Sequence, residues 1–132
     1  MFTLQQMKAA HAKVKTGADF PCYVQEIKAL GLKRYTYSVT DGTTTYYGEN
    51  GYQVPGPAIY EPKVINPVAS PEKLRYFIEI HQQGQTDFLT LCGQVATAGV
   101  RQWVVDTERM LCLYEDADGR EMVVEPIPDT GY

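Results

Sequence analysis

The chain has 132 residues, 44% of them apolar and 21% charged, and its formal net charge is −4. These values predict one globular domain over residues 1–132 and exclude an intrinsically disordered chain. The acidic balance argues against nucleic acid as a partner, because duplex binding requires clustered Lys and Arg. With no apolar run near the roughly 20 residues that span a bilayer, and no signal peptide, we expect a cytoplasmic protein without membrane association.

The first half of the chain, residues 3–54, predicts two helices followed by three strands. Thr3 to Gln6 has the form of a capping box, and apolar residues at helical spacing follow it. Asp19 suits the N-cap of a second helix, which Gly31 is placed to end. The helical period therefore covers about the first thirty residues.

Strands are indicated where the apolar period changes from 3.6 to 2, beginning with the segment RYTYSVT. Asp41-Gly42 predicts a two-residue type I′ turn, which requires positive φ at both positions. The strand TTTYY returns, and a short third strand follows at Tyr52 to Val54. Residues 55–69 are rich in proline, which suits an extended connection better than the interior of an element.

The second half, residues 70–126, predicts the same order of elements. Ser70 and Pro71 begin a helix as its cap and first residue, and the next helix runs from about Asp87 to Ala98. Three strands follow in the segments VRQWVVD, RMLCLYE and REMVVEP. The order helix–helix–strand–strand–strand is thus predicted twice.

A shift of 68 residues aligns the two halves. It pairs Asp19 with Asp87, Phe20 with Phe88, Gly31 with Gly99, Tyr35 with Trp103 and Tyr46 with Tyr114. Upstream, a shift of 70 pairs His11 with His81. We interpret this pattern as an internal duplication of an ααβββ unit.

The duplication predicts the fold class. Neither half buries enough apolar surface alone, so the two copies should share one core, with their helices on one antiparallel sheet or on two opposed sheets. We therefore expect an α+β fold in which a helix layer covers an antiparallel sheet. In such a core the aligned pairs Phe20/Phe88 and Tyr35/Trp103 should all be largely buried, and Asp19 and Asp87 should act as equivalent caps.

His11 and His81 are the only histidines, and both are predicted at the end of the first helix of their half. There they favour the helix C-terminus electrostatically. Alternatively they meet across the halves, where they line a ligand cleft or bind a metal together with Asp19 and Asp87. No HxH, HExxH or Cys/His spacing supports the metal, and we predict neither a metal nor a cofactor.

Catalytic motifs are absent from the sequence. It contains no GxSxG, Walker A or GxGxxG pattern, and its three cysteines, which lack CxxC spacing, are interpreted as free thiols. We assign no catalytic residue, and the prediction leans away from an enzyme.

Tyrosines near the first hairpin and the proline-rich connection predict an exposed aromatic surface. They are Tyr46, Tyr47, Tyr52 and Tyr60. Tyrosine is enriched at interfaces because its ring packs while its hydroxyl stays wet, although ordinary pairing within a sheet also accounts for it. Our preferred hypothesis is a non-catalytic protein that binds and modulates another protein through this surface. The alternative is a small-ligand-binding protein or enzyme with a cleft between the halves near His11 and His81, and a homodimer is compatible with both.

Several segments resemble the YdfO-like (also YbcV-like) family of small bacterial and prophage-borne proteins, some of which are described as phage envelope proteins. These segments are GADF, VTDGTTTYYGENGY, HQQGQTDF and AGVRQWVVD followed by CLYEDADGREMVVEPIP. The resemblance covers nearly the whole chain. It implies an α+β two-layer fold in a cytoplasmic, often prophage-associated protein, and it supplies no catalytic residues. With this resemblance, the partner in our preferred hypothesis is a host or phage protein.

Overall fold

The structure is a computed structural model that describes residues 2–14 and 19–127. Its helices are α1 (Leu4–His11), α2 (Phe20–Ala29), α3 (Pro71–Gln82) and α4 (Phe88–Thr97), with a short 3-10 helix η2 (Glu49–Gly51). Its strands are β1 (Arg34–Ser38), β2 (Thr44–Tyr47), β3 (Gln53–Pro55), β4 (Val100–Asp106), β5 (Leu111–Asp116) and β6 (Glu121–Pro126). The order of two helices followed by three strands occurs twice, as predicted.

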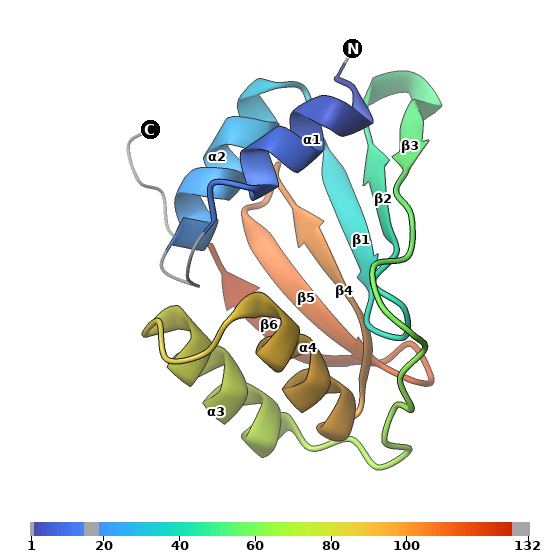
Figure 1. The fold of residues 1–132 in the computed structure, drawn as a ribbon, viewed down its shortest axis with the longest axis vertical. Helices are drawn as coiled ribbons and strands as arrows, with labels where there is room; N and C mark the ends of the chain where they lie inside the picture. The colour runs from blue at the N-terminus through green and yellow to red at the C-terminus, as the bar shows by residue number, and fades with distance from the viewer. Residues whose placement is uncertain (1, 15–18, 128–132) are drawn as a thin grey trace.

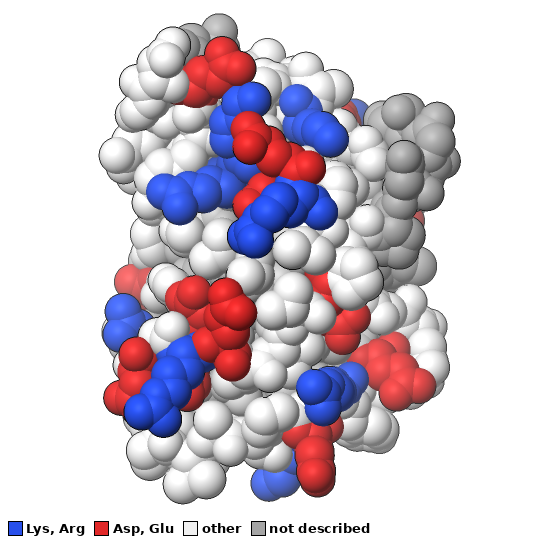
Figure 2. Space-filling model, turned by 180° about the vertical axis from the view of Figure 1, so that it is seen from behind, with Lys and Arg blue, Asp and Glu red and all other residues white. Residues whose placement is uncertain are grey.

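One antiparallel sheet contains all six strands, in the order β3-β2-β1-β4-β5-β6. The four helices cover one face of it, with α1 and α2 beside each other at one end and α3 and α4 at the other (Figure 1). The predicted α+β class, with a helix layer on an antiparallel sheet, is confirmed. The view from behind shows basic and acidic side chains intermixed over the molecule (Figure 2).

The core lies between the helices and the sheet. Alternate residues of each strand point to the same face, so the inward positions of β1 and β4 are buried. Tyr35 and Trp103 are each 5% exposed, which confirms the prediction that this aligned pair is largely buried. Trp103 also stacks on Tyr37, with ring centroids 4.2 Å apart. From the helices, the fully buried side chains include Met7, Val24, Ile27, Leu74 and Val95.

Helix ends follow the predicted signals, with one exception. Thr3 and Gln6 form the capping box of α1, and the Ser70 hydroxyl accepts a hydrogen bond from the N–H of Lys73. The Asp87 carboxylate caps α4 by accepting a hydrogen bond from the N–H of Thr90 at 2.7 Å. Asp19 stands at the N-cap of α2 but makes no side-chain capping bond, so the predicted equivalence of the two aspartates is wrong.

The hairpin between β1 and β2 differs from the predicted two-residue type I′ turn. Gly42 has a φ of +76°, but Asp41 is not among the described residues with positive φ. The Asp41 carboxylate instead accepts hydrogen bonds from the N–H (3.0 Å) and the hydroxyl (2.6 Å) of Thr43. This side-chain turn stabilises a wider loop, closed by the bond from the N–H of Ser38 to the carbonyl of Thr43.

β1 and β4 meet at the centre of the sheet in a register that treats the two halves alike. Tyr35 lies opposite Val105, Thr36 opposite Val104, and Tyr37 opposite Trp103. The 68-residue shift turns position 36 into 104, so Thr36 lies opposite its own counterpart. The next strands agree, because Tyr35 faces Tyr46 and Trp103 faces Tyr114. The duplication itself stays a prediction, to which this register adds support.

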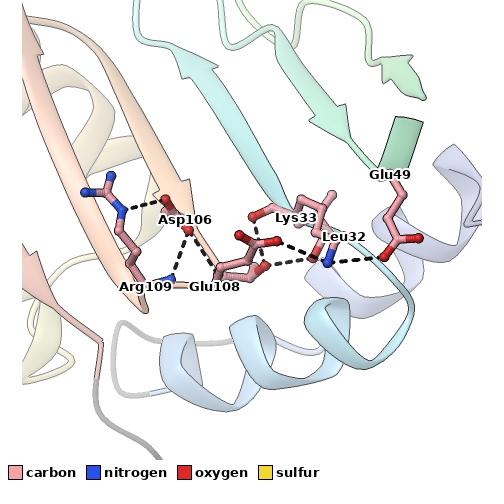
Figure 3. Close-up of polar contacts among 7 residues, drawn as sticks. Leu32, Lys33, Glu49, Asp106, Glu108 and Arg109 are labelled. Atoms are coloured by element: carbon pink, nitrogen blue, oxygen red, sulfur yellow. Dashed lines mark hydrogen bonds and ion pairs between the residues drawn. The ribbon is translucent and has the colours of Figure 1, made fainter. Parts of the chain in front are cut away.

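Hydrogen bonds at both ends of the β1–β4 pair follow the same relation. The N–H of Val39 donates to the carbonyl of Arg101 (2.8 Å), and the N–H of Thr107 donates to the carbonyl of Lys33 (3.0 Å). The Thr107 hydroxyl, which is fully buried, also donates to the carbonyl of Leu32 at 2.7 Å. At the same end the Lys33 ammonium forms ion pairs with Glu49 and Glu108 (Figure 3).

Candidate ligand-binding cavity

A cavity of about 410 Å³ lies between the α1–α2 pair and the α3–α4 pair. All four helices contribute to its walls, and its floor comes from residues of β1, β4, β5 and β6. Its volume falls within the range of about 300–1,000 Å³ that is typical of small-molecule sites. Both halves of the chain are therefore needed to build it.

Phe20 and Phe88, which were predicted to be largely buried, are only half-buried. Each lies at the first position of its helix, where it packs against the edge of the core and also lines the cavity. The Phe88 ring makes an edge-on contact with the ring of Tyr37 at 5.4 Å and lies 6.1 Å from Trp103. The prediction is wrong for this pair because the two helix pairs do not close over the centre of the sheet.

His11 ends α1 and places its imidazole against aromatic rings. Its centroid lies 5.4 Å from the ring of Tyr23 and 5.2 Å from the ring of Phe88, both in edge-on geometry. Burial lowers the pKa of His11 below the ordinary value of 6.5, because the charged form loses hydration. His11 is therefore a neutral part of the cavity wall near pH 7.

His81 lines the same cavity from the last turn of α3. Its Nδ1 lies 3.0 Å from the carbonyl oxygen of Thr86, and a carbonyl only accepts hydrogen bonds, so Nδ1 carries the proton. Burial lowers the pKa of His81, while the bond to Thr86 and the nearby Asp87 oppose that shift. In the neutral ring Nε2 is then an acceptor. The structure thus brings both predicted histidines to one cavity.

The floor of the cavity holds the Cys112 thiol, the Glu125 carboxylate and the phenols of Tyr35 and Tyr114. Burial raises the pKa of the Cys112 thiol to about 12 and raises that of Tyr114 well above 10. The charge of Glu125 adds to both shifts. The Cys112 thiol and the Tyr114 phenol are consequently held neutral, and a neutral thiol is a poor nucleophile.

Glu125 is a lining residue that the sequence analysis missed. It lies opposite Cys112 in the β5–β6 register and so points to the helix-covered face, half-buried. A charged residue at an inward strand position is an available sequence signal, because buried carboxylates are rare without a functional or paired role. Reading that signal requires the register of β6.

The four tyrosines of the predicted surface do not share one face. Tyr46, predicted to be exposed, is 7% exposed and faces the helices, because it lies opposite the inward Tyr35. Tyr47 is half-buried on the opposite face, where the Arg34 guanidinium lies 4.3 Å from its ring centroid. The hydroxyls of the two half-buried tyrosines that remain, Tyr52 and Tyr60, donate to the carbonyls of Phe2 and Val39.

The metal alternative finds no set of ligands in residues 2–14 and 19–127, where no group of three His, Cys, Asp or Glu side chains is placed to hold an ion. Asp87 uses its carboxylate to cap α4.

None of the described helices is long and apolar enough to cross a membrane.

Comparison with known proteins places the chain in a family. The family model described as a protein of unknown function (DUF1398) matches residues 8–126, which include the end of α1, the other three α-helices and all six strands. No curated protein matches the chain. The matched range contains every residue that lines this cavity except Ile127, which directly follows β6. The chain belongs to the DUF1398 family.

Proposed function

We propose that the protein binds a small, largely apolar, ring-bearing molecule in the cavity between its two helix pairs and performs no chemistry on it. The observation that carries the proposal is the cavity itself, which both halves line and which contains both histidines. A concave, mostly apolar site with a few convergent polar groups is the usual form of a small-molecule site.

The walls favour an aromatic or alicyclic ligand. Tyr23, Phe88 and Trp103 present ring edges and faces to the cavity, and rings pack well against such groups in edge-on or offset geometry. The acceptor at Nε2 of His81 suits a ligand that donates one hydrogen bond. These features together favour a neutral ring with an N–H or O–H group.

Binding without catalysis is supported by the protonated state of Cys112 and Tyr114 in the cavity floor. The raised pKa of Cys112 keeps its thiol protonated near neutral pH, and Tyr114 stays a neutral phenol. An activated nucleophile requires a lowered pKa or an adjacent base. Among the hydrogen bonds of the described residues, none joins a cavity histidine to the Cys112 thiol. Nδ1 of His81 bonds to Thr86 instead.

The experiment is a titration with N-phenyl-1-naphthylamine, a neutral ring probe that carries one N–H and brightens in apolar surroundings. We expect saturable binding to the wild-type chain with one probe per chain. Leu91→Trp replaces a lining side chain with a bulky indole that fills part of the cavity. It should weaken binding by about tenfold or more, which corresponds to about 1.4 kcal/mol.

Leu89→Trp is the matched control, because Leu89 lies on the same helix but is 59% exposed and does not line the cavity. This variant should bind the probe as the wild type does. Probe binding that Leu91→Trp and Leu89→Trp leave equally unchanged would place the probe elsewhere and refute the proposal.

A host or phage protein partner at Tyr47, Tyr52 and Tyr60 stays a prediction, and it loses support because these tyrosines are half-buried and do not share one face. The YdfO-like, prophage-associated identity, the cytoplasmic setting, the single domain and the homodimer likewise stay predictions.

A further inference from the structure

A second cavity of about 230 Å³ adjoins the first. It lies between α1, the β1–β2 hairpin and the proline-rich connection. Five residues line both cavities, namely His11, Tyr23, Tyr35, Phe88 and Trp103. Its volume alone is below the range of about 300–1,000 Å³ for ligand sites, so it makes more sense as an extension of the larger cavity.

Two of the five residues that line both cavities, His11 and Phe88, bring their side-chain rings together. His11 comes from the end of α1 and Phe88 from the start of α4, and their rings touch only edge to edge at 5.2 Å. Both are half-buried. Because rotamer changes of partly exposed side chains are fast and need no backbone movement, a chain-like ligand can pass between these two rings.

The charges at the two ends of this paired space have opposite sign. Among the lining residues that the structure describes, Lys8 is the one Lys, Arg, Asp or Glu of the smaller cavity, and Glu125 is the one of the larger. Lys8 lines the smaller cavity and is exposed, and it forms no ion pair with the described carboxylates.

We propose that the ring-bearing ligand also has an elongated apolar chain that ends in one carboxylate. Its neutral ring lies in the larger cavity, its chain passes between His11 and Phe88, and its carboxylate lies at Lys8. This inference rests on the proposed function and adds the class of ligand. Charge complementarity sets the direction, because Glu125 disfavours an anionic end in the larger cavity while Lys8 attracts one at the other end.

Calorimetric titration of the full chain with three probes, below their micelle concentrations, tests the ligand class. The probes are dodecanoate, hexanoate and dodecyltrimethylammonium. Dodecanoate should bind at least about tenfold more tightly than hexanoate, because each buried methylene contributes about 0.8 kcal/mol. It should also bind more tightly than the cationic probe, which has the same chain length.

Two matched pairs of variants locate the binding. Thr44→Leu fills the smaller cavity and should weaken dodecanoate binding by about tenfold, whereas Thr45→Leu, on the opposite face of β2, should not. Lys8→Gln should weaken it by about two- to fivefold, as expected for an exposed charge pair, while the exposed Lys28→Gln should have no effect. All four variants should keep the wild-type affinity for N-phenyl-1-naphthylamine.

Failure of this inference is distinguishable from failure of the proposed function. If the naphthylamine binds but dodecanoate gains nothing over hexanoate, or Thr44→Leu behaves as Thr45→Leu does, the elongated carboxylate is excluded and the ring-binding cavity stands. If neither the naphthylamine nor dodecanoate binds the wild-type chain, both proposals are overturned. Dodecanoate binding that is blocked by Thr44→Leu and weakened by Lys8→Gln supports the inference.

Discussion

Tyr35 faces Tyr46 across β1 and β2, and Trp103 faces Tyr114 in the same register across β4 and β5. The helices above these strands agree less well. α1 has 8 residues and α3 has 12, and the histidines that end them are used differently.

His11 packs between aromatic rings, whereas His81 hydrogen-bonds to Thr86. The difference teaches which layer is constrained. Paired strands restrict each other through a continuous hydrogen-bond ladder, so counterpart positions keep their roles. The two helix pairs have no such hydrogen-bond ladder between them, and the differences between them leave a cavity with unlike ends.

The largest expected effect on stability distinguishes a residue of the buried sheet layer from a residue of the cavity wall. Trp103→Ala should lower the free energy of unfolding by about 3–5 kcal/mol, because the side chain is buried and stacked on Tyr37. Phe88→Ala should cost about half as much, since its half-buried ring faces a cavity that already exists. Urea unfolding followed by far-ultraviolet circular dichroism measures both, and equal losses would contradict the distinction between core and wall.

A smaller effect separates the two glycines that end the second helix of each half. Gly31 and Gly99 have φ values of +105° and +95°, so alanine at either position costs about 1–2 kcal/mol. A Cβ at Gly99 would also lie 2.8 Å from the Cα of Ala69, whereas one at Gly31 would meet open space.

Gly99→Ala should therefore lower the free energy of unfolding by about 2–4 kcal/mol, more than Gly31→Ala does, because overpacking adds to the strain. The measurement is the urea midpoint of each variant. A Gly31 variant that is as unstable as the Gly99 variant would mean that the contact with Ala69 contributes nothing.

His81→Ala should have a modest effect, of about 1 kcal/mol, because it removes one hydrogen bond to Thr86 from a half-buried side chain. Thermal unfolding at neutral pH measures it. A variant that unfolds like Trp103→Ala would show that His81 belongs to the core and that the cavity does not reach it.

The smallest expected effect is a slope with pH. Both histidines have a pKa below 6.5 in the folded chain, so the unfolded chain binds more protons as the pH falls through and below that value. Stability should therefore decrease from about pH 7.5 to about pH 5.

His11→Phe should flatten this slope more than His81→Phe does, because only the shift of His81 is opposed by a hydrogen bond and a nearby carboxylate. Melting temperatures of the two variants across this pH range provide the measurement. A slope that both variants leave unchanged would assign the pH dependence to other groups.

Much of the fold was predictable from local chemistry. The Ser70 cap and the positive-φ glycines at positions 31 and 99 indicate helix ends. A capping hydrogen bond and a positive φ each depend on only a few neighbouring residues. The face of a short strand was not predictable in the same way. In TTTYY the alternation makes either Tyr46 or Tyr47 the inward residue, and only pairing with Tyr35 decides for Tyr46.

The candidate site was predictable in part. The aligned positions of His11 and His81 suggested a cleft between the halves, and both residues line the cavity. The wall formed by Phe20 and Phe88 could not be predicted, because an apolar residue at the start of a helix has the same pattern whether it packs inward or borders a void. Glu125 depends on the register of β6, which shifts at an irregularity beside Tyr114.

The most direct test of the cavity uses Trp103, the one tryptophan of the chain, which lines both cavities. Energy transfer from this indole to N-phenyl-1-naphthylamine reports whether the probe lies beside it. The account predicts sensitised probe emission that saturates at one probe per chain, is lost on unfolding in urea, and falls when dodecanoate is added. Probe binding without transfer from Trp103, or no saturable binding at all, would contradict the claim that this cavity is a ligand site.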